Sequence, residues 1–290
     1  MPCFHPLTGW PSRHVNPSGK RSFTFSEAQG FGSPVPLPCG QCIGCRLDRA
    51  KAWSLRLMHE AQFHDQSAFI TLTYSEEHLP PDRSLSMADY RDFWKRFRRA
   101  LAPVRVRFLG CGEYGDDFGR PHYHAIVFGH AFLEDRKRHS KGKHGDQIYT
   151  SAFLDERWGL GNTYVGSVTQ QSCGYVARYC VKKVTGERAA AHYQGRTPEF
   201  LTCSKGLGQA WFDQFSSDVF PDDAVIMNGR RNRVPRYYDN QLPEDLLAEY
   251  KAARIARAEK YAWNNTPARL AVREEVTKAR VTSLKRDLPT

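Results

Sequence analysis

The sequence predicts an α+β fold, because strand-like runs alternate with amphipathic helical patterns along the chain. Residues 68–74 are rich in β-branched and aromatic side chains, which is typical of a buried strand. Residues 104–109 alternate with a period of two, as a half-exposed strand does, and residues 122–128 form a third strand-like run. The turn-rich stretch 114–121 lies between the last two runs, so we expect them to form an antiparallel hairpin.

Helices are predicted before and after the first strand. Residues 47–61 combine good helix formers with apolar residues spaced three to four apart. A second helix begins at Ser86, with Asp89 in place of the usual glutamate of a capping box. Its apolar stripe consists of Tyr90, Phe93, Trp94, Phe97 and Leu101. Its opposite face carries Arg91, Lys95, Arg96, Arg98 and Arg99.

The remaining elements follow from the same kinds of pattern. Residues 1–38 are rich in Pro, Gly and Ser and show no helical period, so we expect them to be irregular. Further along, the patterns predict an exposed basic loop at residues 130–150, a helix at 150–158 and a strand at 163–168. They then predict a second helix at 172–184, an irregular stretch at 185–210 and a hairpin about Asn228-Gly229 at 224–235.

Three parts are expected along the chain. A Cys-rich segment and helix occupy residues 1–65, a sheet domain occupies residues 66–245, and a basic helical tail occupies residues 246–290. After residue 245 there are ten Lys and Arg against five Asp and Glu. This tail is consistent with a helix on the body, with a nucleic-acid-binding arm, or with a frayed end.

Composition narrows the class of protein. The 42 Lys and Arg exceed the 31 Asp and Glu, giving a formal net charge of +11. This charge favours a polyanionic partner such as nucleic acid. The alternative is that it serves solubility alone. The 40% of hydrophobic residues excludes a mostly disordered chain. No apolar run approaches the ~18 residues of a membrane span, and the first residues lack the features of a secretory signal, so we expect a soluble intracellular protein. In that setting the eight cysteines are metal ligands or buried thiols rather than disulfides.

The first group of candidate functional residues is His122-Tyr123-His124. Residues i and i+2 of a strand point to the same face, so the two imidazoles lie side by side. Glu113, at the end of the preceding strand, can reach that face across the hairpin. Two imidazoles and one carboxylate form a metal site with open positions for substrate and water. Two ordinary surface histidines remain the alternative.

The second group lies on the helix at residues 172–184. Tyr175 and Tyr179 are four residues apart, so their phenols share one face, and Lys183 extends it. A nearby cation and a metal can activate a tyrosine for attack on a phosphate. Alternatively, the two tyrosines pack into a core with the lysine at the solvent edge.

The third group is a cysteine cluster. Cys39, Cys42 and Cys45 bring three thiolates together at short range, and Cys3 or His5 can supply a fourth zinc ligand. An iron–sulfur cluster and three free thiols are the competing interpretations, but the usual four-cysteine spacing of an iron–sulfur protein is absent from this sequence.

The order of these motifs resembles that of a known family. Residues 69–74, residues 112–115 with 120–124, and residues 175–183 are similar to the three ordered motifs of rolling-circle replication initiators, the HUH endonucleases. The similarity in detail is to the replication initiators of gokushovirus-type microviruses, which are single-stranded DNA phages. It covers roughly residues 1–245. It also includes residues 38–46, residues 204–208 with Trp211, and residues 234–238.

The resemblance implies an RRM-like central antiparallel sheet with helices packed on one side and the tyrosine helix against it. It implies that His122, His124 and Glu113 bind Mg²⁺ or Mn²⁺. It further implies that Tyr175 and Tyr179 are paired nucleophiles, with Lys183 as the helper cation. Because Mg²⁺ prefers oxygen ligands, two imidazoles also suit Mn²⁺.

Two positions depart from the pattern of the family. Arg178 stands where related phages often have lysine, and Lys182 is an alternative to Lys183 as the helper cation.

The resemblance also implies an activity. One tyrosine attacks the origin, leaving a 5′-phosphotyrosine and a 3′-OH that primes the host polymerase, and a second attack rejoins the DNA at the end of the round. The expected partners are single-stranded and origin DNA and the host helicase and polymerase, in the cytoplasm of a bacterial host. The expected DNA contacts are Lys95, Arg96, Arg99, Arg105, Arg107 and Lys182.

Three other interpretations of the sequence remain. A plasmid-type initiator or relaxase would use the same chemistry in another biological context. A non-catalytic zinc-stabilised nucleic-acid-binding protein would use the basic residues and keep the tyrosine pair in its core. A metal hydrolase would use water instead of tyrosine as the nucleophile.

Overall fold

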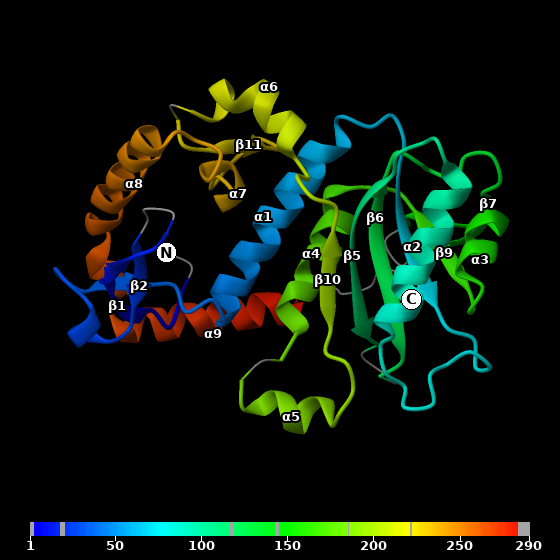
Figure 1. The fold of residues 1–290 in the computed structure, drawn as a ribbon, viewed down its shortest axis with the longest axis horizontal. Helices are drawn as coiled ribbons and strands as arrows, with labels where there is room; N and C mark the ends of the chain where they lie inside the picture. The colour runs from blue at the N-terminus through cyan, green and yellow to red at the C-terminus, as the bar shows by residue number, and fades with distance from the viewer. Residues whose placement is uncertain are drawn as a thin grey trace. The chain divides into compact units, whose positions relative to one another are not determined.

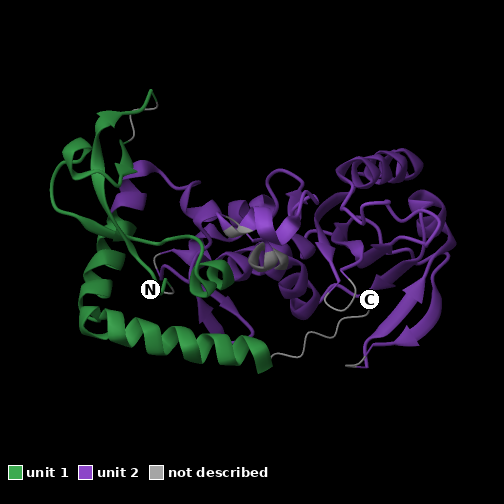
Figure 2. Ribbon diagram, turned by 90° about the horizontal axis from the view of Figure 1, so that it is seen from below, with its two compact units in different colours: residues 1–48, 249–285 green, residues 49–248, 286–290 purple. Residues whose placement is uncertain are grey.

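The computed structural model describes residues 3–17, 21–115, 119–142, 145–184, 186–220 and 222–283, with the backbone alone at 179–182 and 188. The chain divides into two compact units, which are coloured separately in Figure 2. Unit 1 consists of residues 1–48 and 249–285, and unit 2 is centred on residues 49–248.

Unit 2 is built on a seven-stranded antiparallel sheet with the strand order β10-β5-β6-β4-β9-β8-β7 (Figure 1). Its strands are β4 (Ser67–Thr73), β5 (Arg107–Tyr114), β6 (Pro121–Phe128), β7 (Lys137–Lys141), β8 (Gln147–Thr150), β9 (Thr163–Gly166) and β10 (Phe200–Cys203). The α+β class and the predicted β5–β6 hairpin are therefore confirmed. The predicted strand at 104–109 lies further along the chain than expected, and β5 is buried except at its ends.

Helices cover both faces of this sheet, whereas the family resemblance implied one. Helices α2 (Met87–Leu101) and α3 (Ala152–Trp158) pack on the face that carries Tyr123 of β6. Helices α1 (Ile43–Ala61) and α4 (Gln170–Lys182) pack on the opposite face, around Ile126 and Phe128 of the same strand. Because side chains of a strand alternate between faces, His122 and His124 belong to the α1–α4 face.

Helix α2 begins as its sequence predicts. The Ser86 side chain accepts a hydrogen bond from the backbone N–H of Asp89, which satisfies one of the unpaired donors of the first turn. The predicted apolar stripe is buried against the sheet, because Tyr90, Phe93, Trp94 and Phe97 all belong to one core cluster. The basic residues therefore lie on the outer side of the helix.

Two segments of unit 2 are more regular than the sequence indicated. Residues 130–150, predicted to be a loop, contain the β7–β8 hairpin at the edge of the sheet. Residues 185–210, predicted to be irregular, contain α5 (Arg188–Tyr193) and the edge strand β10. Strand β7 is exposed and polar, and β8 and β10 have only four residues each, so none of the three gives a clear strand pattern in the sequence.

The rest of unit 2 packs around α1. Helix α6 (Gln209–Val219), the hairpin of β11 (Val225–Met227) and β12 (Arg230–Asn232), and α7 (Arg236–Asp239) share a core cluster with Leu55 of α1. The motif at residues 204–208 binds the same helix. Arg56 donates two hydrogen bonds to the carbonyl oxygen of Leu207, and Glu60 accepts one from the backbone N–H of Gly208 at 2.7 Å. The loop at 204–208 and α7 are therefore held against α1.

Buried His59 of α1 makes the stability of unit 2 sensitive to acid. Its ring stacks on Trp211 at 3.5 Å between ring centroids, and Nδ1 lies 2.8 Å from the Tyr238 hydroxyl. Burial lowers the pKa of His59 to about 4. The unfolded chain takes up this proton below pH 6.5 and the folded chain below pH 4, so folding stability falls as the pH drops between these values.

We expect His59 to contribute about 2–3 kcal/mol to the loss of unfolding free energy between pH 7.5 and 4.5. In the variant His59→Gln this part of the pH dependence should be absent, which urea unfolding at both pH values measures. Exposed His78 provides the control, because His78→Gln should leave the pH dependence as it is in the wild type. An equal pH dependence in wild type and His59→Gln would contradict the assignment.

Unit 1 contains a three-stranded antiparallel sheet where the sequence predicted an irregular segment. Strand β1 (Leu7–Val15) pairs with β2 (Arg21–Thr24) on one side and β3 (Val35–Leu37) on the other. Gly9 and Pro11 in β1 and Pro36 in β3 concealed the pairing, since both residue types are uncommon in strands. A short 3₁₀ helix, η1 (Glu27–Gln29), precedes β3.

The helical C-terminal tail is confirmed. Helix α8 (Glu244–Glu259), the 3₁₀ helix η2 (Ala262–Asn265) and helix α9 (Pro267–Ser283) follow one another. Among the described residues, no helix is both long enough and apolar enough to cross a membrane.

Candidate metal and tyrosine site

Glu113, His122 and His124 converge on one face of the β5–β6 hairpin. Glu113 is the register partner of His122, and Cys111 is that of His124. Oε1 of Glu113 lies 2.6 Å from Nε2 of His122 and 3.2 Å from Nε2 of His124. All three side chains are buried, with exposed fractions of 1%, 6% and 0%. The hairpin thus brings together the three predicted ligands.

Each histidine ring is oriented by a contact at its other nitrogen. Nδ1 of His124 lies 2.9 Å from Oγ1 of Thr71, which is buried and is the register partner of His124 on β4. Nδ1 of His122 lies 3.1 Å from the backbone carbonyl oxygen of Arg120, which accepts its hydrogen bond. Both Nε2 atoms are therefore directed toward Glu113. Such outer contacts hold metal-binding imidazoles in position.

The electrostatics of the site keep Glu113 ionised. Burial by itself raises the pKa of a carboxyl, but hydrogen bonds from His122 and His124 and the charge on those rings lower the pKa of Glu113 to about 2. The carboxylate therefore supplies a fixed negative charge among two imidazoles. The ligand atoms of the three residues all lie within 4.8 Å of one another. This donor set fits a divalent cation with positions open to further ligands.

The reverse side of strand β6 is fixed to the start of α2. The Tyr123 hydroxyl donates to the carbonyl oxygen of Ser86 at 3.0 Å and accepts from the N–H of Ser86 at 2.9 Å. The same hydroxyl lies 2.8 Å from that of Tyr74, which donates to Asp89. The residue between the two histidines thus anchors their strand to the opposite layer of the unit.

Tyr175 of α4 packs directly on His124. Its ring is perpendicular to that of His124, with 5.2 Å between centroids, and its edge meets Phe69 at 6.2 Å. The helix begins with a capping box between Thr169 and Ser172. Tyr175 is 7% exposed, so its ring is an almost buried part of the site.

The other predicted residues of α4 are placed less fully. Tyr179 and Lys182 belong to the helix, but their side chains lie outside the described part of the structure. Lys183 is the C-cap residue, and its side chain is exposed.

Two residues near the site, Arg178 and Thr71, have no role assigned from the sequence. The guanidinium of Arg178 lies over the Tyr175 ring, 6.0 Å from its centroid. Thr71 supports His124, as described above. One signal was available for Thr71, because it is a polar residue on the same face of strand β4 as Phe69. The closeness of Arg178 to Tyr175 depends on its rotamer, which a sequence pattern does not give.

Three of the cations predicted to contact DNA lie away from this face. Helix α2, with Lys95, Arg96 and Arg99, packs on the opposite side of the sheet. Arg96 donates to the carbonyl oxygens of residues 157 and 158 at the end of α3.

The predicted cations near β5 lie at the far end of the hairpin. Arg107 pairs with Glu60 at 3.1 Å and donates to the carbonyl oxygen of Lys205. It lies six residues along β5 from Glu113, about 20 Å in a strand. Arg105 precedes this strand and is exposed.

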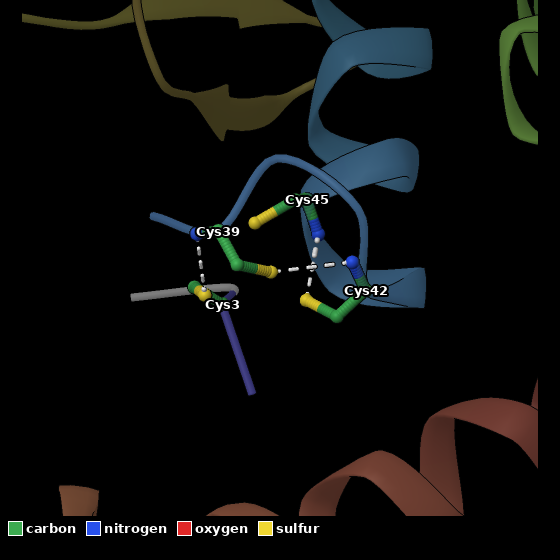
Figure 3. Close-up of side chains that lie close together, drawn as sticks. All are labelled: Cys3, Cys39, Cys42 and Cys45. Atoms are coloured by element: carbon green, nitrogen blue, oxygen red, sulfur yellow. Dashed lines mark hydrogen bonds between the residues drawn. The ribbon is translucent and has the colours of Figure 1, made fainter. Parts of the chain in front are cut away.

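The four predicted zinc ligands meet in unit 1. The sulfur atoms of Cys3, Cys39, Cys42 and Cys45 lie within 4.8 Å of one another and face a common centre (Figure 3). Burial raises the pKa of Cys42, but hydrogen bonds from the backbone N–H groups of Phe4 and Cys45 lower it to about 6. Cys3 is thus the fourth member of the cluster, while the ring of His5 pairs with Glu274 instead.

The contact between Thr71 and His124 predicts a measurable effect on metal affinity. Thr71→Val keeps the shape of the side chain and removes the hydroxyl, so the His124 ring loses its orienting partner. We expect Mn²⁺ affinity to fall about 10–100-fold by titration calorimetry, with Thr71→Ser restoring it. Thr73→Val is the matched control, because the Thr73 hydroxyl bonds the carbonyl oxygen of Asn162 instead. Equal affinities in all variants would exclude the role of Thr71.

Comparison with known proteins identifies relatives of the chain. The model of the family "Replication-associated protein ORF2/G2P" matches residues 67–184, which contain β4 to α4 and thus the whole site. Replication-associated protein VP4 of Bdellovibrio phage phiMH2K is 37% identical over 249 residues, covering 83% of this chain and 76% of VP4. No solved structure matches the chain.

Two further phage and virus proteins are similar. Replication-associated protein ORF2 of Spiroplasma virus 4 is 30% identical over 230 residues, covering 74% of this chain and 70% of its own length. Replication-associated protein ORF4 of Chlamydia phage 1 is 34% identical over 214 residues, covering 71% of this chain and 53% of ORF4. Because the identity to VP4 and ORF2 extends over most of both partners in each comparison, this chain belongs to the replication-associated protein family of phages, as the resemblance of its motifs to gokushovirus-type replication initiators implies.

Proposed function

We propose that this protein initiates rolling-circle replication by nicking one DNA strand at the phage origin, and that it rejoins the strand to end the round. One observation carries the proposal: Glu113, His122 and His124 converge beside the ring of Tyr175. Family membership adds the biological setting, which is phage DNA replication. A tyrosine beside a divalent-metal site is suited to phosphoryl transfer.

The proposed step moves a phosphodiester bond from DNA to the protein. The phenolic oxygen of Tyr175 or Tyr179 bonds to phosphorus, while the bond from phosphorus to the 3′ oxygen breaks. The phenol loses its proton to water, and the 3′ oxygen takes one up. A 5′-phosphotyrosine and a free 3′-OH result. Since one phosphodiester replaces another, the bond energy is retained and rejoining consumes no nucleotide.

Two tyrosines on one helix allow the round to end. After one circuit, the first tyrosine still holds the old 5′ end. The second tyrosine cuts the regenerated origin, and the released 3′-OH attacks the first linkage. This frees a closed circle and leaves the second tyrosine attached to DNA, so the two residues exchange roles from round to round.

The residues around the phosphate have separate roles in this proposal. Glu113, His122 and His124 would hold Mg²⁺ or Mn²⁺, which polarises a phosphate oxygen when bound. The Arg178 guanidinium, beside the Tyr175 ring, favours negative charge on the phenol. Lys183 or Lys182 would add positive charge at the end of α4.

The substrate is single-stranded DNA at the origin, because a paired backbone does not readily enter such a site. Arg105 and the exposed cations of α2 would contact flanking DNA. Host helicase and polymerase would extend the 3′-OH. Because phage DNA replicates inside the host cell, we expect these partners in the bacterial cytoplasm. In this proposal Zn²⁺ at the four cysteines is structural.

Incubation of the protein with Mn²⁺ and an end-labelled single-stranded origin oligonucleotide tests the proposal. We expect a covalent protein–DNA adduct that survives a denaturing gel, together with a shorter product ending in a 3′-OH. Omission of Mn²⁺ and Mg²⁺ is the control and should give neither species. Binding without cleavage of oligonucleotides that tile the whole phage origin region would favour a non-catalytic DNA-binding protein. Cleavage without an adduct would favour a hydrolase that uses water.

A further inference from the structure

The four cysteines of unit 1 have the geometry of a zinc site. A tetrahedral ion with zinc–sulfur bonds of about 2.3 Å separates its sulfurs by about 3.8 Å. The sulfurs of Cys3, Cys39, Cys42 and Cys45 lie within 4.8 Å of one another, so small side-chain movements complete the tetrahedron. Apart from Cys180, whose side chain is not described, every cysteine of the chain is a free thiol.

Backbone N–H groups surround these sulfurs. The N–H groups of Phe4 and Cys39 lie 3.3 Å from the sulfurs of Cys42 and Cys3, respectively. The N–H of Cys42 lies 3.3 Å from the sulfur of Cys39, and that of Cys45 lies 3.5 Å from the sulfur of Cys42 (Figure 3). N–H donors stabilise thiolates, and such contacts orient metal ligands. These contacts therefore favour the charged form of the sulfurs that they reach, which belong to Cys3, Cys39 and Cys42.

This cluster is also the hydrophobic core of unit 1. Among the described residues of the unit, the buried apolar cluster consists of Cys3, Phe4, Cys42, Cys45 and Leu270. Three of its five members are cysteines, whereas large apolar side chains of the unit are exposed, including Phe25 at 64% and Trp263 at 70%. A core this small does not offset the entropy of ordering a unit of this size, so another stabilising element is required.

The cluster joins segments that are far apart in the sequence. Cys3 belongs to the N-terminal segment, and Cys45 belongs to the first turn of α1. Leu270 of α9 packs on the cysteines, and one turn later Glu274 accepts a hydrogen bond from His5 at 2.8 Å. An ion at the centre would fix the N-terminal segment to α1. Helix α9 packs on both of these segments through Leu270.

We propose that Cys3, Cys39, Cys42 and Cys45 bind one zinc ion, and that this ion holds helix α9 against the N-terminal segment, so that unit 1 folds only with zinc bound. This role is independent of the proposed nicking chemistry, because neither the tyrosines nor the histidines take part in it. Zinc that joins segments remote in sequence supplies folding free energy directly.

Metal analysis of the full-length protein, purified without added metal, is the first test. We expect about one zinc per chain in wild type and in Cys203→Ser, and loss of that zinc in Cys42→Ser. Cys203 is the matched control because it is an exposed thiol outside the cluster. Iron with the visible absorption of an iron–sulfur cluster, or well-folded wild type without any metal, overturns the proposal.

Limited trypsin digestion tests the structural role, even where Cys42→Ser fails to fold. Arg269 immediately precedes the buried Leu270, so cleavage there requires α9 to leave the cluster. A zinc chelator should speed this cut in wild type by about tenfold or more, and added Zn²⁺ should reverse the effect. Unchanged protection after complete zinc removal refutes the role. Neither measurement uses DNA cleavage, so its outcome is separable from that of the proposed function.

Discussion

Replacing Tyr175 and Tyr179 together by phenylalanine is expected to abolish the covalent DNA adduct and to lower strand cleavage at least about 10⁴-fold, because both nucleophiles are lost. Each single substitution should retain measurable cleavage, since the remaining tyrosine can attack the same phosphate. Phenylalanine preserves the ring contact of Tyr175 with His124, so the core around α4 stays packed. Adduct formation on denaturing gels and single-turnover cleavage rates measure both effects.

The tyrosine series has an internal control. Tyr164 of β9 lies outside α4, and Tyr164→Phe removes a phenol without touching the proposed nucleophiles. Its cleavage rate should equal that of wild type. If the double variant of α4 still cleaves the origin while forming no adduct, water is the nucleophile, and the protein is a metal hydrolase. A double variant that still forms the adduct would require a different attacking residue.

The second large effect is expected at the proposed metal ligands. His122→Ala removes one of three donors, so cleavage with Mn²⁺ should fall at least about 10³-fold. Binding of single-stranded origin DNA should change by less than about threefold, because phosphate contacts elsewhere persist. Calorimetric titration with Mn²⁺ separates the two properties by measuring the loss of the ion directly. Fluorescence anisotropy measures DNA affinity.

The histidine test needs a check on folding. His122→Gln keeps more of the side-chain volume, and thermal unfolding in the absence of metal shows whether either variant disturbs the sheet. His139→Gln is the control, because His139 is an exposed histidine on β7, outside the ligand set. Cleavage at the wild-type rate by a folded His122 variant would exclude this site as the metal centre.

Much of the sheet could be predicted because its central strands are locally encoded. Strands β4 and β6 carry continuous apolar and β-branched runs. Helix α2 has both the Ser86 N-cap and the apolar stripe that its sequence predicts. The sequence pattern places strand β5 too early, because Gly110 lies at its centre and Gly112 in its second half, and glycines weaken a strand pattern. Pairing with β6 and β10 makes that half a strand, and this pairing lies outside any local window.

The exposed edges of the fold could not be predicted for a related reason. Strand β7 has five exposed residues and a basic composition, so it carries no hydrophobic signal. It becomes a strand because β8 offers hydrogen-bond partners. The same holds for β1, which contains Gly9 and Pro11, and for β3, which contains Pro36, since their pairing arises from hydrogen bonding between adjacent strands.

The period of a strand by itself put His122 and His124 on one face, and the hairpin brought Glu113 to them; these are local properties, and sequence determines them. Only the tertiary structure decided that Tyr175 lies against His124, that Thr71 orients this ring, and that the cations of α2 lie behind the sheet. It also selected Cys3 over His5 for the sulfur cluster. The physical reason is that the helix covering a sheet face is determined by the packing of segments that are remote in the sequence, and the periodicity of a single segment does not specify that packing.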